Sequence, residues 1–529
     1  MMANKNPGIR LLGLGLLEIL VLILGLGARP ASAQAQPGGQ WSEPLSLSAR
    51  TPEYRQKGWF PDMVMDSQGA AHVIWLVSDN TTSNGAQDYD RVFYQAISPE
   101  GVPSASPPAN IAISDFGFAP RTSIAIDNKR GLLHMVFRSF KGSVYYQYAP
   151  LNAASTPAAW STPRNIDDFS GVSYYSDVAV DKKGVIHAVW TQVKPGADGK
   201  YRQVVMYRQS SDLGKTWSFP KTMAEPKNGA SRVTLRLDAD DGLHLSWDDG
   251  YDNLLNQFKY TYGVYTHSTD GGQTWSTPLV VGSESDPVGQ TMVTPFGSSG
   301  VMLIWRDMEG QKIGYIVSND RGQTWSAPAD IPGFVARRLY GQNQFDRYSL
   351  AADATGHVYL AAVGMVDKAV EVETPDDVAV YFIYWDKGIW AQPETVARLK
   401  GFPEYVRIGV GADRVHLVWF TRDAYIQSSA QTTWYASRPF NTGFTSEPVG
   451  TFVPPPPATP FRADSTPTLV QPTPVPIAPP EDPVQVINQS ADWAWWLVAL
   501  SLVPLIAIGI GFSMLIKWLK RTENRFTLK

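Results

Sequence analysis

Three arginines that lie far apart in the sequence occupy one position of a repeated pattern, and this pattern includes an aspartate. The residue six places before that aspartate is, in successive copies, Phe60, Arg121, Tyr175, Arg232, Gln290, Arg347 and Tyr405. An arginine guanidinium presents a planar fork of donors that matches a carboxylate. Because structural residues recur in every copy, a binding site is expected where the copies differ. We therefore predict that Arg121, Arg232 and Arg347 bind an anionic ligand. The alternative is that they pair with carboxylates of the protein itself.

Histidines also recur at one repeat position, and rings of imidazoles can bind metal ions. They are His72, His134, His187, His244 and His416. However, Met302 and Tyr359 fill the same position in two other copies. A position that accepts these residues is better explained by packing and hydrogen bonding. We predict no metal site there.

Two aspartate-rich stretches, 238–242 and 248–252, can supply oxygen ligands to Ca²⁺. Their spacing does not fit an EF-hand loop, and turns are often this acidic. The chain contains no cysteine, which excludes disulfides and thiolate metal sites. It also lacks a phosphate-binding loop and a nucleophile elbow. We expect no cofactor.

A short repeated phrase in the sequence, the motif S-x-D-x-G-x-T-W, indicates the elements that would position these residues. It occurs at 210–217, 268–275 and 318–325. Its aspartate can close a turn by accepting backbone N–H groups, and its glycine can take a positive φ. The tryptophan then packs into the adjoining core. We predict that Asp212, Asp270 and Asp320 close hairpin turns and have no catalytic role.

A second pattern, D-x-x-G-x-x-H-x-x-W, extends the repeat over most of the chain. Positions 72, 134, 187, 244, 302, 359 and 416 are equivalent, with spacings of 62, 53, 57, 58, 57 and 57 residues. This regularity predicts an all-β fold, a β-propeller with seven four-stranded blades over residues 41–445. A third motif, W-S-x-P, is missing after the seventh copy but present at Trp41. We therefore expect the N-terminal strand to complete the last blade and close the ring.

The three copies of the phrase resemble the Asp-box of the sialidase-like (BNR-repeat) β-propellers. Well-known sialidases have six blades, so six blades is the alternative. The resemblance implies that the three arginines bind a substrate carboxylate. It also implies a tyrosine nucleophile with a glutamate and an aspartate acid, for which Tyr405, Glu404 and Asp62 are the candidates. The sialidase F/Y-R-I-P signature is absent, and the nearest string is residues 119–122.

The two ends of the chain predict export and membrane attachment. Residues 1–33 resemble a secretory signal peptide with a small-residue cleavage site. Residues 446–490 are rich in proline, which favours an extended stalk. The apolar segment 493–516 is long enough to form a transmembrane helix, and the basic tail 517–529 is expected in the cytoplasm. We predict a single-pass cell-membrane protein with an extracellular propeller.

Composition limits the partners. The formal net charge is −4, with 45 basic and 49 acidic side chains. This balance lacks the excess of basic residues that is typical of a protein that binds nucleic acid. The first hypothesis is a membrane-tethered propeller that binds a glycan or protein ligand at its axial face. The alternatives are an exo-sialidase-type glycoside hydrolase and a scaffold that assembles a membrane complex.

Overall fold

A computed structural model describes most of residues 39–454. The gaps in the described residues are 56, 80–88, 115–121, 140–141, 169–170, 197, 227–228, 253–256, 339–347, 367–369, 371–372, 412, 424–429 and 443–446. The predicted signal peptide, the transmembrane segment and most of the stalk lie outside the described residues. Among the described residues, no helix is long and apolar enough to cross a membrane.

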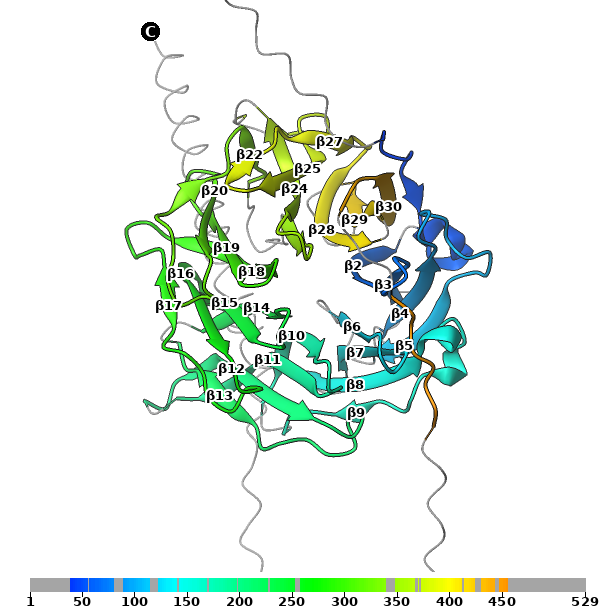
Figure 1. The fold of residues 1–529 in the computed structure, drawn as a ribbon, viewed down its shortest axis with the longest axis horizontal. Helices are drawn as coiled ribbons and strands as arrows, with labels where there is room; N and C mark the ends of the chain where they lie inside the picture. The colour runs from blue at the N-terminus through cyan, green and yellow to red at the C-terminus, as the bar shows by residue number, and fades with distance from the viewer. Residues whose placement is uncertain are drawn as a thin grey trace, which may run out of the picture. The chain divides into compact units, whose positions relative to one another are not determined.

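Seven antiparallel sheets are arranged radially around an axis, each with its first strand innermost (Figure 1). The inner strands are β2 (Gly58–Met65), β6 (Ser123–Asp127), β10 (Ser173–Val180), β14 (Ala230–Leu237), β18 (Val288–Phe296), β23 (Tyr348–Ala352) with β22 (Phe334–Ala336), and β28 (Phe402–Gly411). The second strands are β3 (Ala71–Asp79), β7 (Leu132–Ser139), β11 (Ile186–Pro195), β15 (Leu243–Asp252), β19 (Gly300–Asp307), β24 (Val358–Val366) and β29 (Arg414–Arg422). The structure confirms seven blades.

The outer half of each blade consists of a third strand and a shorter outer strand. The third strands are β4 (Tyr89–Ile97), β8 (Ser143–Pro150), β12 (Tyr201–Ser210), β16 (Gln257–Ser268), β20 (Ile313–Ser318), β25 (Ala379–Asp386) and β30 (Gln431–Pro439). The outer strands are β5 (Ala109–Ser114), β9 (Arg164–Asn165), β13 (Lys221–Ala224), β17 (Leu279–Val281), β21 (Ala329–Asp330), β26 (Ile389–Trp390) with β27 (Glu394–Ala397), and β1 (Leu45–Ser46). Short 3₁₀ turns are η1 (Ser48–Arg50), η2 (Pro52–Tyr54), η4 (Leu151–Ala153) and η5 (Pro157–Ala159).

The N-terminal strand closes the ring, as the displaced W-S-x-P motif predicts. β1 is the outer strand of the seventh blade and pairs with β30, with Leu45 opposite Tyr435. Trp41 packs edge-on against Phe382 of the sixth blade, with ring centroids 5.6 Å apart. Sequence-distant ends of the domain therefore share one sheet, which leaves the wheel without an open seam.

Tryptophans near the outer strands join neighbouring blades. Each packs edge-on against an aromatic ring on the third strand of the preceding blade, at centroid distances of 5.0–6.3 Å. The pairs are Trp160–Tyr94, Trp217–Tyr146, Trp275–Tyr207, Trp325–Tyr265, Trp390–Tyr315 and Trp41–Phe382. Burial of these large rings holds blade against blade.

The recurring histidines form hydrogen bonds within their own blades. The Nδ1 atom of each lies 2.7–2.8 Å from a tyrosine hydroxyl on the third strand. The pairs are His72–Tyr94, His134–Tyr146, His187–Tyr207, His244–Tyr265 and His416–Tyr435. This confirms the predicted packing and hydrogen-bonding role. Burial lowers the pKa of His134 and of His416 to about 3, so both imidazoles are neutral at physiological pH.

The Asp-box aspartates close hairpin turns, as predicted. Asp270 accepts bonds from the Thr274 hydroxyl at 2.6 Å, the Thr274 N–H at 2.9 Å and the Ser268 hydroxyl at 2.8 Å. The Thr274 hydroxyl and backbone bonds lower the pKa of Asp270 to about 2. Gly272 has φ +85°, and an added Cβ would lie 2.1 Å from the Tyr207 hydroxyl of the preceding blade. The turn therefore needs glycine both for its conformation and for its close contact with the sheet of the preceding blade.

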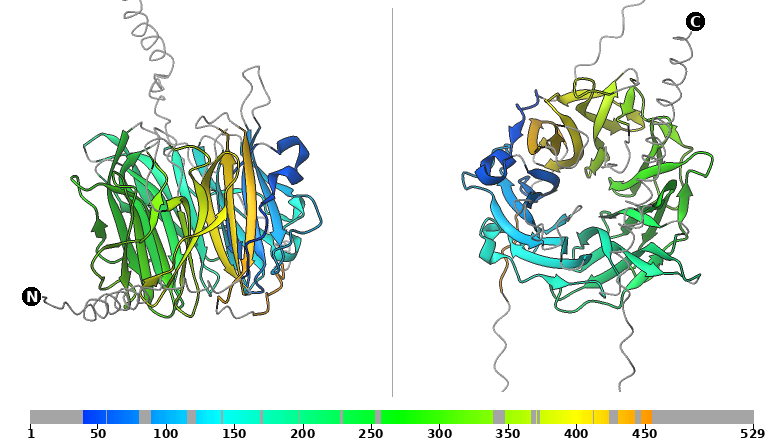
Figure 2. Two further views of the ribbon diagram at one scale, coloured as in Figure 1. Left: turned by 90° about the horizontal axis from the view of Figure 1, so that it is seen from above. Right: turned by 180° about the vertical axis from the view of Figure 1, so that it is seen from behind.

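The first residues of the Pro-rich region are part of the propeller. We call residues 447–452 the strap; it crosses the turns of the first two blades (Figure 2, left, orange). Its Glu447 N–H donates to Ser67 O at 2.8 Å, and its Gly450 N–H donates to Asn128 O at 2.7 Å. Phe452 packs against Tyr148. The propeller unit thus extends to about residue 455.

Candidate functional site: the axial cavity

The repeat position that carries the three predicted arginines is a β-bulge near the start of the inner strand. Phe60, Arg232, Gln290 and Tyr405 have φ values of 45°, 52°, 56° and 52°, and the register of each strand shifts there. Each of these side chains is at most 3% exposed, and only that of Tyr405 lines the axial cavity, whereas Phe60, Arg232 and Gln290 do not. The position is therefore buried wherever the structure describes it.

Of the three predicted anion-binding arginines, Arg121 and Arg347 lie outside the described residues. Arg232 is 3% exposed, and its Nη1 lies 3.5 Å from Asp248 Oδ2. Its guanidinium also lies 6.0 Å from the centroid of the Tyr175 ring. Asp248 in turn accepts the N–H groups of Gln290 and Thr291, both at 2.7 Å. Arg232 thus pairs with a carboxylate that links the fourth blade to the fifth.

Side chains two residues after this repeat position do reach the axis, and they are Asp62, Ser123, Asp177, Thr234, Met292, Ser349 and Arg407. All seven line a narrow pocket, and Asp62, Ser123, Asp177, Ser349 and Arg407 also line an adjoining space of about 440 Å³. We call the pocket and this space together the axial cavity. Two residues further on, the wall consists of Val64, Ala125, Ala179, Arg236, Thr294, Ala351 and Gly409. The cavity is therefore charged and polar near the bulges. Further along it is mostly small and apolar, apart from Arg236.

Asp177 accepts hydrogen bonds from both neighbouring blades. It accepts the Ser123 hydroxyl at 2.6 Å, the Leu235 N–H at 2.8 Å and the Arg236 Nη1 at 2.8 Å. These contacts tie the second and fourth blades to the third. They also hold the Arg236 guanidinium at the cavity wall, where its side chain is 39% exposed.

Asp62, the predicted acid, has an electrostatic setting that differs from that of Asp177. Its Oδ2 accepts the Ile124 N–H at 3.1 Å, and its Oδ1 lies 3.6 Å from Arg407 Nε. Burial raises the pKa of Asp62 to about 6, against the opposing charge of Arg407 and with a smaller contribution from Asp177. Asp62 therefore changes charge near neutral pH.

Arg407 and Tyr405 form one wall of the cavity. The Arg407 guanidinium carbon lies 3.7 Å from the centroid of the Tyr405 ring, a cation–π contact. Tyr405, the candidate nucleophile, lines the cavity beside Asp62 and packs edge-on against Phe60.

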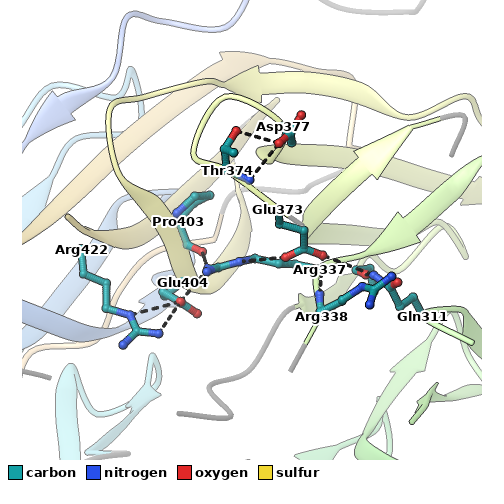
Figure 3. A network of polar contacts seen from close by, with 10 residues as sticks. Gln311, Arg337, Arg338, Glu373, Thr374, Asp377, Pro403, Glu404 and Arg422 are labelled. Atoms are coloured by element: carbon teal, nitrogen blue, oxygen red, sulfur yellow. Dashed lines mark hydrogen bonds and ion pairs between the residues drawn. The ribbon is translucent and has the colours of Figure 1, made fainter. Parts of the chain in front are cut away.

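Glu404, proposed as the partner of Tyr405, lies in a fully buried network of charges (Figure 3). Its Oε1 accepts Arg337 Nη1 at 2.6 Å, Arg422 Nη2 at 2.9 Å and Arg422 Nε at 3.2 Å. Arg337 also donates to Pro403 O at 3.1 Å. The network continues through Glu373, whose Oε2 lies 3.5 Å from Arg337 Nε. These charges brace the sixth blade against the seventh.

The described residues include no group of three or more His, Asp or Glu side chains placed to hold a metal ion. In the first acidic stretch, Asp238 accepts the N–H groups of Asp240 and Gly242 at 2.8 and 2.7 Å. In the second, Asp248 is used between blades. Asp238 thus closes a turn and Asp248 forms a contact between blades.

The cavity offers two guanidinium groups, one carboxylate that titrates near pH 6, and hydroxyls from Ser123, Thr234 and Ser349. Such groups can bind a ligand rich in hydroxyls that also carries an anionic group. Sequence reasoning missed Arg236 and Arg407. The same repeat alignment finds both: Arg236 lies four residues after the chosen position and Arg407 two residues after it.

Comparison with known families supports the repeat assignment. Residues 143–345 match the model of the BNR repeat-like domain, and this range contains all three Asp-box phrases. No curated protein matches the chain.

Solved structures resemble the chain at low identity. One is a protein of unknown function from Dyadobacter fermentans, with 14% identity, 77% of this chain and 100% of that chain covered, and a TM-score of 0.43. Another is an ulvan lyase bound to a GlcA–Rha3S saccharide, with 11% identity, 72% of this chain and 94% of that chain covered, and a TM-score of 0.46. A third is the NanB sialidase from Streptococcus pneumoniae, with 12% identity, 78% of this chain and 71% of that chain covered, and a TM-score of 0.39. At these values the likenesses carry no argument about ligands.

Proposed function

We propose that this seven-bladed β-propeller, whose residues 143–345 match the BNR repeat-like domain, binds a glycan in its axial cavity while anchored to the outer face of a cell membrane. The observation that carries the proposal is the set of side chains two residues after the bulged repeat position. These positions differ from blade to blade, as a binding site requires, and five of them line one space of about 440 Å³. That volume falls within the usual range for small-molecule sites.

Arg407 and Arg236 are the groups proposed to contact an anionic substituent, and Asp62 a hydroxyl. A charge-assisted hydrogen bond contributes about 1.5–3 kcal/mol, so its loss lowers affinity about 10- to 100-fold. The test is a panel of immobilised acidic and neutral glycans probed with the wild type, Arg407→Gln and the control Arg164→Gln at the exposed rim. Loss of acidic-glycan binding in Arg407→Gln alone supports the proposal. Equal binding by all three proteins, or binding to no glycan, overturns it.

A second candidate is hydrolysis of a sialoside, favoured by the position of Tyr405 and of the titrating Asp62 in the same cavity. Turnover of a fluorogenic sialoside by the wild type but not by Asp62→Asn or Tyr405→Phe would select the enzyme. Binding without turnover selects the lectin-like function. Membrane anchoring is tested separately, by the release of the propeller from intact cells with an added protease.

A further inference from the structure

The run of intact Asp-boxes in the third, fourth and fifth blades ends at the junction between the fifth and sixth blades. In the fourth blade the box runs from Ser268 to Trp275, whereas the sixth blade has only 385–390 for the same turn. Phe382 pairs with Ala361 as Tyr265 pairs with Ser246, which aligns the two strands. By this alignment Trp385 replaces the box serine.

The same alignment places Lys387 where the box aspartate stands. An acidic group that closes its own turn is thus exchanged for an exposed ammonium group. Among the described residues, Lys387 forms no ion pair. Its neighbour Asp386 lies 3.6 Å from His357, on the inner side of the turn.

A second substitution acts on the other wall of the same junction. Met302 occupies the position of the recurring histidine in the fifth blade, so Tyr315 has no histidine partner of the kind that fixes Tyr265. Tyr315 still packs edge-on against Trp390, at 5.5 Å, but it remains partly exposed.

A groove of about 460 Å³ lies between the shortened turn and Tyr315. Its lining includes Tyr315, Asn319, Ala327, Ala329, Trp385 and Lys387. An aromatic ring accepts the C–H face of a sugar, the Asn319 amide can bond hydroxyls, and an ammonium attracts a carboxylate or a sulfate.

We propose that this groove, on the rim between the fifth and sixth blades, binds an acidic sugar residue. The anionic group contacts Lys387 and the ring packs on Tyr315. The site shares no residue with the axial cavity, so it does not depend on the function proposed above.

The test uses the detergent-solubilised full chain and a glucuronate-containing disaccharide, titrated by calorimetry or by saturation-transfer NMR. We expect Lys387→Gln to weaken binding about fivefold, as the loss of an exposed ion pair would. The carboxyl-reduced disaccharide should bind to the wild type about as weakly as the intact disaccharide binds to Lys387→Gln. Ala329→Trp places a bulky ring in the groove at an exposed position and should abolish binding. The matched control is Lys215→Gln, in the intact box of the third blade, which should bind as the wild type does.

Three results overturn the proposal. The first is that the wild type does not bind the disaccharide. The second is that Lys387→Gln and Ala329→Trp, shown to be folded by near-UV circular dichroism, bind it as well as the wild type. The third is that binding is lost in Arg407→Gln and kept in Ala329→Trp, which assigns the disaccharide to the axial cavity.

Discussion

Replacing Glu404 by glutamine separates a structural role from a catalytic one. The carboxylate is 0% exposed, and its Oε1 receives three donors from Arg337 and Arg422. Glutamine keeps the shape but removes the negative charge, and its NH₂ group cannot accept from a guanidinium. Two buried cations then share a network that has lost one of its two carboxylates (Figure 3).

Breaking a buried ion pair by removing one partner costs about 3–5 kcal/mol, because the remaining charge is left in a medium of low polarity. We therefore expect the free energy of unfolding of Glu404→Gln to fall by about that amount. The assay is chemical denaturation followed by tryptophan fluorescence, since Trp419 and Trp434 lie in the seventh blade. The matched control is Asp377→Asn, a surface carboxylate bonded to Thr374 in the adjoining blade, which should have little effect.

A Glu404→Gln variant as stable as the control would refute the bracing argument. Loss of sialoside turnover without loss of stability would instead support the catalytic role that the resemblance implies. The two explanations of this residue thus predict opposite results in the stability measurement.

Three further perturbations test the wheel and its cavity. Burial favours protonated Asp62 in the folded state, so its ionisation costs stability between about pH 4 and 6; the stability of Asp62→Asn relative to wild type should rise by about 2 kcal/mol from pH 4 to 7 in urea titrations. Gly131→Ala puts a Cβ 1.9 Å from a strap carbonyl and should cost about 2 kcal/mol and expose the strap to protease, unlike Gly199→Ala, whose Cβ meets open space at a similar positive φ. Tyr207→Phe removes a histidine's partner and should lower stability by about 1 kcal/mol, whereas the exposed Tyr201→Phe should not.

Repetition made the fold predictable from the sequence. Seven equivalent positions fixed the number of blades, and Trp41 supplied the one missing motif, so the closing strand could be located without coordinates. The histidine position was interpreted correctly because Met302 and Tyr359 also occupy it. In each case, comparing the repeats with one another showed which positions are structural, as an alignment of related proteins would.

The repeat did not predict which side chains of the inner strands point toward the axis. The bulge adds one residue to the inner strand in the blades where its register shift is seen, so spacing between copies does not reveal it. Phe60 and Asp62 would share a face in a regular strand, but the bulge turns the first aside and leaves the second on the axis. Glu404 in the seventh blade pairs with Arg337 in the sixth. This pair does not recur at equivalent positions of the other blades, so the sequence carries no signal for it.

The strap lies away from the charged part of the cavity. It leaves the wheel across the turns at Ser67 and Asn128, the edge where the inner strands end. The bulges and the charged part of the cavity lie near the opposite ends of those strands. The strap and the charged part of the cavity therefore lie at opposite edges of the propeller. Gly131→Ala loosens this attachment without touching Arg407, so it should change protease release of the propeller and leave glycan affinity unchanged.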